Sequence, residues 1–197
     1  IVQIGEWILQ EACSQMQLWQ QRNILPADTF MSVNLSVQQF NDPHLLKRID
    51  ETLQLTHLNS KNLKLEITES ALMTNSDAAI KILHRLKNRG ISLSIDDFGT
   101  GYSSLNYLHC FPIDVLKVDQ SFIQQMVKGQ KYLSLVQAIR TLAYHFDMVM
   151  IAEGIETEAQ MECLKAMDCI LGQGYLFCPP VDYQTLESKY LPCFNEV

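Results

Sequence analysis

The sequence lacks the features of a membrane-spanning or secreted chain. No stretch approaches the ~18 consecutive apolar residues of a membrane span, although 47% of the residues are hydrophobic. The first residues do not have the basic-then-apolar order of a secretory signal. Low-complexity stretches, blocks of like charge and linkers rich in Gly, Pro or Ser are also missing. We therefore expect a single cytoplasmic domain over residues 1–197, whether or not a longer parent protein has a membrane anchor.

Positive charge and metal-binding sulfur are scarce as well. The formal net charge is −7, whereas surfaces that hold a nucleic-acid backbone are usually basic. We therefore expect no nucleic-acid polymer among the partners, while a small phosphodiester still fits an acidic protein if metal ions supply the positive charge. The six cysteines form no CxxC pair and no histidines have zinc-finger spacing, which predicts reduced thiols.

The sequence contains a repeated alternation of short β-branched runs and helical patterns. Strands are predicted at residues 30–35, 63–68, 93–97, 115–119, 149–153 and, more weakly, 174–177. Amphipathic helices are predicted at 4–19, 77–87 and 133–144. Gly90 follows a last turn rich in Lys and Arg, as a helix stop should. Strands that alternate with helices predict an α/β fold with a parallel sheet covered on both faces.

Polar residues at the ends of these strands separate two architectures, the closed (β/α)₈ barrel and the open doubly wound sheet. The residues at or near the carboxyl ends are Asn34, Glu66, Asp96, Asp97, Lys117 and Glu153. A TIM-type barrel brings all strand ends to one rim, whereas an open sheet spreads them along a line. We therefore favour the barrel. Six strands do not close an eight-stranded barrel, so about two N-terminal strands are predicted to be missing.

Two of the polar clusters each allow a structural and a functional interpretation. Asn34, in VNLS, is either an ordinary turn residue that caps the next helix or a ligand at the rim. Glu66, in LEITES, interrupts a strand that should be buried, and Glu69 follows three residues later. A buried carboxylate needs a partner, which is either a metal ion or a salt bridge with Lys117 or an arginine.

The most specific cluster is IDDFGTGYSSL at residues 95–105. Neighbouring side chains on a strand diverge, but on a curling strand end Asp96 and Asp97 can reach the same rim. Two carboxylates held together repel each other, and a bound divalent cation commonly offsets this repulsion. Gly99 and Gly101 then permit a tight loop in which Thr100 is a hydroxyl partner. A plain turn accounts for one glycine but not for this whole run.

A fourth cluster combines KVD at 117–119 with AEGIE at 152–156. Lys117 and Asp119 alternate on one strand face, Glu153 precedes a glycine, and Gly174 marks a further rim position. Each of these features, taken alone, has an alternative interpretation as part of an ion pair inside a barrel. Together the clusters supply hard oxygen ligands without Cys or His, which suits Mg²⁺ or Mn²⁺ rather than zinc. Such sites are typical of two-metal phosphoryl-transfer enzymes, so metal-assisted phosphodiester hydrolysis is the predicted chemistry.

The motifs VNLS, LEITES, IDDFGTGYSSL, LKVDQSF, IAEGIET and QGYLF resemble, in this order and spacing, those of the EAL-domain family. The opening IGEWILQEAC resembles the helix that follows the signature strand of that family. The resemblance covers essentially the whole chain. It implies a TIM-type barrel, hydrolysis of cyclic di-GMP to linear pGpG with two Mg²⁺ or Mn²⁺ ions, and a homodimer. Sensor or GGDEF domains are expected in the parent protein.

The resemblance also assigns roles to individual residues. By it, the metal ligands are Asn34, Glu66, Asp96 and Glu153, with Asp97 shared with the second ion. Lys117 would hold the attacking water, and Glu153 would also be the general base. Glu69 would anchor a loop at residues 98–105 that contains Gly99, Thr100 and Gly101, and that couples the metal site to the dimer interface. Gln173 would lie in the water and substrate network.

The sequence departs from the family pattern in three places. Gln120 stands where an arginine is common, and Cys178 and two prolines replace the usual residues after QGYLF. The Glu-Ala-Leu that names the family, whose glutamate is a metal ligand, is absent together with the strand before it. We therefore expect a single, N-terminally truncated EAL-type domain with weakened metal binding and poor turnover. The alternative is an inactive EAL-like receptor of cyclic di-GMP or a protein-interaction module.

Overall fold

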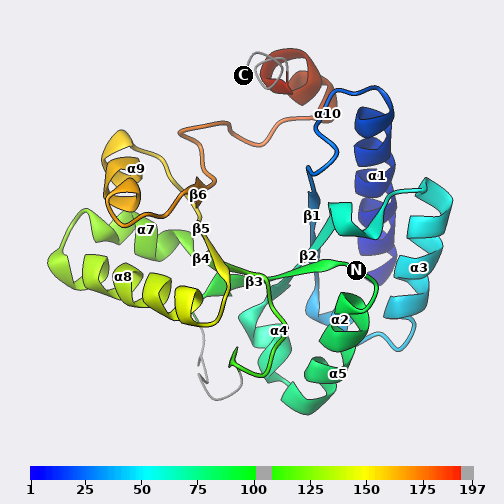
Figure 1. The fold of residues 1–197 in the computed structure, drawn as a ribbon, viewed down its shortest axis with the longest axis horizontal. Helices are drawn as coiled ribbons and strands as arrows, with labels where there is room; N and C mark the ends of the chain where they lie inside the picture. The colour runs from blue at the N-terminus through cyan, green and yellow to red at the C-terminus, as the bar shows by residue number, and fades with distance from the viewer. Residues whose placement is uncertain (101–107, 192–197) are drawn as a thin grey trace.

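The protein folds around one parallel sheet, as the computed structural model shows for residues 1–100 and 108–191 (Figure 1). The sheet has six strands in the order β1-β2-β3-β4-β5-β6. Their bounds are β1 Met31–Leu35, β2 Leu63–Thr68, β3 Ser92–Phe98, β4 Val115–Val118, β5 Val149–Ala152 and β6 Leu171–Gly172. All neighbouring strands pair in parallel.

Helices connect the strands and lie around the outside of the sheet (Figure 1). They are α1 Val2–Gln21, α2 Val37–Phe40, α3 Leu45–Thr56, α4 Glu69–Met73, α5 Ser76–Lys87, α7 Gln120–Met126, α8 Gln130–His145, α9 Glu158–Lys165 and α10 Tyr183–Thr185. Short turns of other helix types are Ser60–Asn62 and Leu186–Tyr190. Within the described ranges, no helix has both the length and the apolar character that a membrane crossing requires.

The strand order decides between the two architectures that the sequence allows. A doubly wound sheet reverses its order at a switch point, but here the strands follow one another in sequence order from β1 to β6. The sheet curls with its helices on the outside, as in a barrel (Figure 1). Among the residues that the structure describes, β1 and β6 each pair with one strand only. The fold is therefore an incomplete TIM-type barrel, in agreement with the sequence-based expectation.

Five of the six predicted strands and the three predicted helices are present with small shifts of their ends. The strand predicted at 174–177 is wrong, because β6 is Leu171–Gly172. Beyond it, Gln173 still donates its backbone N–H to Ala152 O at 2.9 Å. The chain then turns, with Phe177 N–H donating to Gly174 O at 3.1 Å. The apolar run Tyr175–Leu176–Phe177 is thus a turn that only resembles a strand in sequence.

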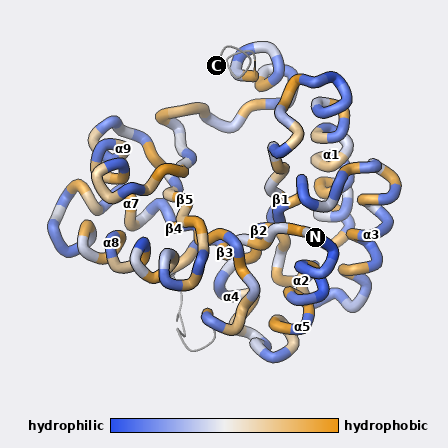
Figure 2. Tube along the Cα trace, viewed as in Figure 1, coloured by the Kyte–Doolittle hydropathy of each residue, from blue (hydrophilic) through white to orange (hydrophobic). Residues whose placement is uncertain are grey.

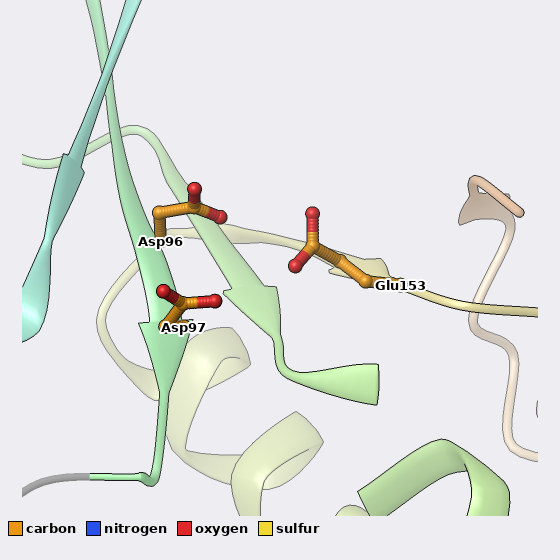
Figure 3. Close-up of side chains that lie close together, drawn as sticks. All are labelled: Asp96, Asp97 and Glu153. Atoms are coloured by element: carbon orange, nitrogen blue, oxygen red, sulfur yellow. The ribbon is translucent and has the colours of Figure 1, made fainter. Parts of the chain in front are cut away.

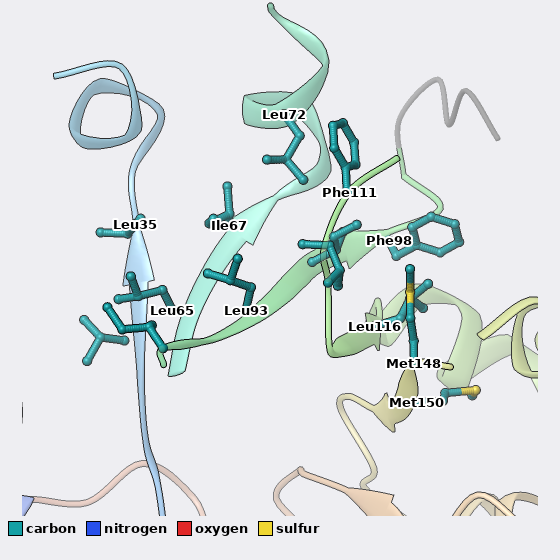
Figure 4. Packing of buried hydrophobic residues seen from close by; sticks show 14 of the residues in the cluster. Leu35, Leu65, Ile67, Leu72, Leu93, Phe98, Phe111, Leu116, Met148 and Met150 are labelled. Carbon is teal, nitrogen blue, oxygen red and sulfur yellow. The ribbon is translucent and has the colours of Figure 1, made fainter. Parts of the chain in front are cut away.

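The core lies between the sheet and the surrounding helices. Hydrophobic positions gather on the strands and alternate with hydrophilic positions around the helices (Figure 2). Leu65 on β2 and Leu93 on β3 are fully buried, and Leu72 from α4 packs in the same cluster (Figure 4). Consecutive side chains of a strand point to opposite faces. The strand residues that alternate with these buried leucines therefore point to the inner face of the sheet, where the charged side chains described below lie.

The two ends of the sheet are linked through the first helix and the C-terminal segment. Trp19 on α1, which precedes β1, donates its indole N–H to Glu187 Oε2 at 3.2 Å. Arg22 forms an ion pair with Glu187 Oε1 at 2.6 Å. Glu187 follows β6, so these contacts connect the two edge strands across the incomplete barrel. The segment before Glu187 runs from β6 toward the top of α1 (Figure 1).

Gly174 lies in the segment between β6 and Glu187, and we predict that only glycine fits at this position. A Cβ at this position would lie inside van der Waals contact of the backbone N and O of Ile155. We expect Gly174→Ala to lower the free energy of unfolding by about 2–3 kcal/mol, as overpacking does. Gly129→Ala is the matched control, because a Cβ there meets nothing within 4 Å, and its effect should stay below about 1 kcal/mol. Urea unfolding measures both variants, and equal losses would contradict the steric explanation.

Candidate functional site

The inner face of the curled sheet carries charged side chains from four neighbouring strands. Glu66 lies on β2, Asp96 on β3 and Lys117 on β4, while Glu153 directly follows β5. In the register, Asp96 pairs with Thr68, which is two residues beyond Glu66, and Lys117 pairs with Ile151, which is two residues before Glu153. Residues two apart on a strand point to the same face, so the four charged side chains share the inner face. The backbone N–H of Glu153 continues the ladder by donating to Val118 O at 3.1 Å. The parallel register therefore gathers the charges at one end of the sheet.

The ammonium group of Lys117 lies at the centre of this cluster. Its Nζ is 2.5 Å from Glu66 Oε2, 2.9 Å from Asp96 Oδ1 and 2.7 Å from Glu153 Oε1. The contact to Glu66 has hydrogen-bond geometry, and the other two are ion pairs. Only 4% of the Lys117 side chain is exposed. Burial alone would lower the pKa of Lys117, but the contacts with Glu153 and Glu66 outweigh it and raise that pKa.

Asp97 joins the cluster because its backbone is left-handed, with φ of +53°. In a regular strand Asp96 and Asp97 would point to opposite faces. The register of β3 against β4 also shifts between Ile95 and Phe98. As a result one oxygen from each of Asp96, Asp97 and Glu153 lies within 4.8 Å of the others. Figure 3 shows the three carboxylates pointing toward one another from β3 and from the end of β5.

The cluster has more negative charge than its lysine neutralises, because three carboxylates contact Lys117 and Asp97 lies beside two of them. Burial raises the pKa of Asp97, and the charges of Asp96 and Asp119 add to the increase. Burial likewise raises the pKa of Glu153, against the opposing effect of Lys117. Carboxylates that repel one another in this way favour a cation between them. Their hard oxygen atoms fit Mg²⁺ or Mn²⁺, so the donor set of this chain suits the predicted ions.

Gln173 fixes the orientation of Glu153. Its side-chain Nε2 donates to Glu153 Oε1 at 2.6 Å. The same oxygen is the one that contacts Lys117. Two donors thus hold Oε1 of Glu153. Gln173 follows β6 directly, so β6 contributes to the site through this amide.

Asn34 shares the inner face but not the hydrogen-bonded cluster. It lies on β1 opposite Glu66 in the register, and paired residues of parallel strands point to the same side. Its side chain is exposed at the open edge of the sheet. Ser36, rather than Asn34, caps the following helix α2, so the capping alternative for Asn34 does not hold. For Glu66, the alternative of a salt bridge with Lys117 is the contact that the structure shows.

The loop after β3 begins with a turn held by side chains. Gly99 donates its backbone N–H to Glu69 Oε2 at 3.1 Å, and Glu69 is buried at the start of α4. Thr100 Oγ1 donates to the backbone oxygen of Asp97 at 2.9 Å. Gly101 and the rest of the predicted loop up to residue 105 lie outside the described residues. Glu69, Gly99 and Thr100 therefore support the site from one side without lying in the carboxylate cluster.

A cleft of about 490 Å³ opens beside the cluster. Its lining includes Asp97, Glu153 and Gln173, and also residues that the sequence did not single out as site residues, namely Asp119, Glu156 and Tyr175. Tyr175 is 67% exposed. The alternation of Lys117 and Asp119 along one strand was a usable signal for Asp119. Glu156 and Tyr175 lie in the motifs AEGIE and QGYLF, but nothing in those motifs indicated that their side chains line a cleft.

With this geometry in view, comparison with known proteins assigns the family. The model of the EAL domain matches residues 1–180. The chain belongs to the EAL family. Among curated relatives, it is 42% identical to the bifunctional diguanylate cyclase/cyclic di-GMP phosphodiesterase MucR of Pseudomonas aeruginosa over 94% of this chain and 27% of MucR. It is 39% identical to the cyclic di-GMP phosphodiesterase NbdA of the same organism over 95% of the chain and 24% of NbdA.

Solved EAL structures have the same fold. A structure described as the PaMucR phosphodiesterase in complex with c-di-GMP is 42% identical and superposes with a TM-score of 0.91, over 94% of this chain and 74% of that one. The EAL enzyme Bd1971 with cAMP and cyclic di-GMP bound is 35% identical with a TM-score of 0.90, over 95% and 51%. This EAL chain spans about a quarter of the length of the curated relatives named above.

Removing the central ammonium should destabilise the metal-free protein. Lys117→Met keeps the length of the side chain but leaves three facing carboxylates without a counter-charge. Breaking a buried ion pair costs about 3–5 kcal/mol, and we expect a loss of that size in urea unfolding with a chelator present. Lys165→Met is the control, because Lys165 forms an exposed pair with Glu162, worth about 0–1 kcal/mol. Similar losses in both variants would contradict a structural role for the Lys117 cluster.

Proposed function

We propose that this EAL domain is a metal-dependent phosphodiesterase that hydrolyses cyclic di-GMP to linear pGpG. The observation that carries the proposal is the convergence of Glu66, Asp96 and Glu153 on Lys117, with Asp97 beside them at an open cleft. A phosphodiester is an anion, and a cluster this acidic receives it only when cations neutralise the carboxylates. Support comes from MucR and NbdA, whose names state a cyclic di-GMP phosphodiesterase activity.

The residues divide into those that hold ions and those that act on water. Asn34, Glu66, Asp96 and Glu153 would hold one Mg²⁺ or Mn²⁺, and Asp97 would be shared with a second. When bound, such ions polarise the phosphodiester and make a coordinated water more acidic. The chain then has to position the water and remove its proton.

Lys117 and Glu153 have the positions that this task requires. The Lys117 ammonium would hold the attacking water and offset negative charge as it develops on the phosphate. Glu153 would take the proton, since its raised pKa makes it a better base than an ordinary carboxylate. Water attacks one phosphorus in line, the bond to a 3′-oxygen breaks, and that oxygen receives a proton. Gln173 keeps Glu153 oriented through its bond to Oε1.

The chain is proposed to act as one EAL-type module of a longer cytoplasmic signalling protein. MucR is named as bifunctional, and this chain matches 27% of its length. A sensor or GGDEF domain in the parent would supply the regulatory input. We also propose that the module works as a homodimer, because open sheet edges favour association.

Asp97→Asn tests the proposed two-metal reaction in the intact protein. The substitution keeps the volume of the side chain and removes one charge, so turnover of cyclic di-GMP with Mg²⁺ should fall by at least ~10²-fold. Asp168→Asn is the matched control: Asp168 is also left-handed, with φ of +54°, but forms an exposed pair with Arg140 far from the cluster. Its turnover should not change. An Asp97→Asn protein with an unaltered rate would exclude the two-metal mechanism.

A further inference from the structure

The first turn of α7 packs directly against the loop that follows Asp97 at the end of β3. Phe122 lies in this turn, and a Cβ on Gly99 would be 2.8 Å from Cε2 and 2.9 Å from Cζ of its ring. Only glycine lets the loop approach the ring this closely. On the opposite side, the Gly99 N–H is held by Glu69. Gly99 is therefore clamped between a carboxylate of α4 and an aromatic ring of α7.

The same turn contacts the loop that carries Glu153. Gly154, with φ of +67°, lies so close to Gln120 that a Cβ would overlap the Gln120 side chain. Gln120 and Phe122 both belong to the first turn of α7. Asp119 caps this turn by accepting the Ser121 N–H at 3.0 Å. One helical turn thus separates the chain after β3 from the chain after β5.

The two clamped glycines lie close in sequence to two of the carboxylates of the cluster, Asp97 and Glu153. Gly99 is two residues beyond Asp97, and the turn between them is closed by Thr100 N–H donating to Asp97 O at 3.3 Å. Gly154 directly follows Glu153. A shift of either glycine therefore moves a carboxylate, so the width of the turn fixes how far apart Asp97 and Glu153 lie.

We propose that the first turn of α7 is a spacer between the loops that follow β3 and β5, and that Phe122 is the positioning residue for Asp97. Phe122 is not itself among the residues that line the cleft, and its ring reaches Asp97 through the contact with Gly99. The left-handed Asp97 is held against repulsion from Asp96 and Glu153, whose oxygens lie within 4.8 Å. Without the ring, Asp97 would move toward solvent. The metal part of this inference rests on the proposed function, whereas the positioning part does not.

A double-mutant cycle in metal-free protein tests the positioning directly. Asp97→Asn removes a repelling charge and should raise the Tm by about 2–4 °C if the carboxylate is held in the cluster. In a Phe122→Leu background the rise should fall to less than half, because the freed Asp97 already avoids the repulsion. Phe122→Met, closer in volume to phenylalanine, serves as a second background if the leucine variant does not fold. The deciding quantity is the difference between the backgrounds.

Ile123→Val is the matched control background. Ile123 is the next residue of α7 and fully buried, but it faces the core rather than Gly99. Asp97→Asn should change the Tm there as it does in the wild type. An equal effect of Asp97→Asn in the wild-type and Phe122→Leu backgrounds would overturn the proposal, whatever its sign.

Titration with Mn²⁺ alone gives a second readout. Phe122→Leu should weaken Mn²⁺ binding by about tenfold, the size typical of residues that orient metal ligands. The Ile123→Val protein should bind Mn²⁺ as the wild type does. A wild-type protein that binds no Mn²⁺ would refute the proposed metal site, while the thermal cycle would still decide the role of Phe122.

Discussion

The contact between the Lys117 ammonium and three carboxylates is the interaction on which the site depends. It joins side chains from β2, β3, β4 and the end of β5, and it does so with the lysine almost fully buried. Burying a single charge is costly unless partners compensate for it. Here each partner comes from a different strand, so the pair interactions also fix the strand ends relative to one another in a barrel with open edges.

The same cluster links the stability of the fold to its chemistry. One ammonium cannot neutralise Glu66, Asp96, Asp97 and Glu153. Burial, with a smaller contribution from neighbouring carboxylates, raises the pKa of Asp97 and of Glu153. The repulsion between these carboxylates opposes folding locally, and it favours a cation between them. Under the proposed function, cations held by these carboxylates would let the cluster receive an anionic phosphodiester.

Close backbone approach is the second constraint on the site. Gly99 against Phe122, Gly154 against Gln120 and Gly174 against Ile155 all bring a loop nearer to its neighbour than a Cβ would allow. These contacts lie in the loops after β3, β5 and β6, next to Asp97, Glu153 and Gln173. The sheet supplies the direction of the functional side chains, and these packed loops set their separations.

The sequence by itself determined the alternation of strands and helices, and it identified the strand-end residues Glu66, Asp96, Lys117 and Glu153. Both follow from local periodicity and from the rule that parallel strands end on one side. The tertiary structure alone decided that Asp97 turns left-handed into the cluster, that one lysine binds three carboxylates, and that residues 174–177 form a turn. These features depend on contacts between loops far apart in the chain, which no local pattern of residues encodes.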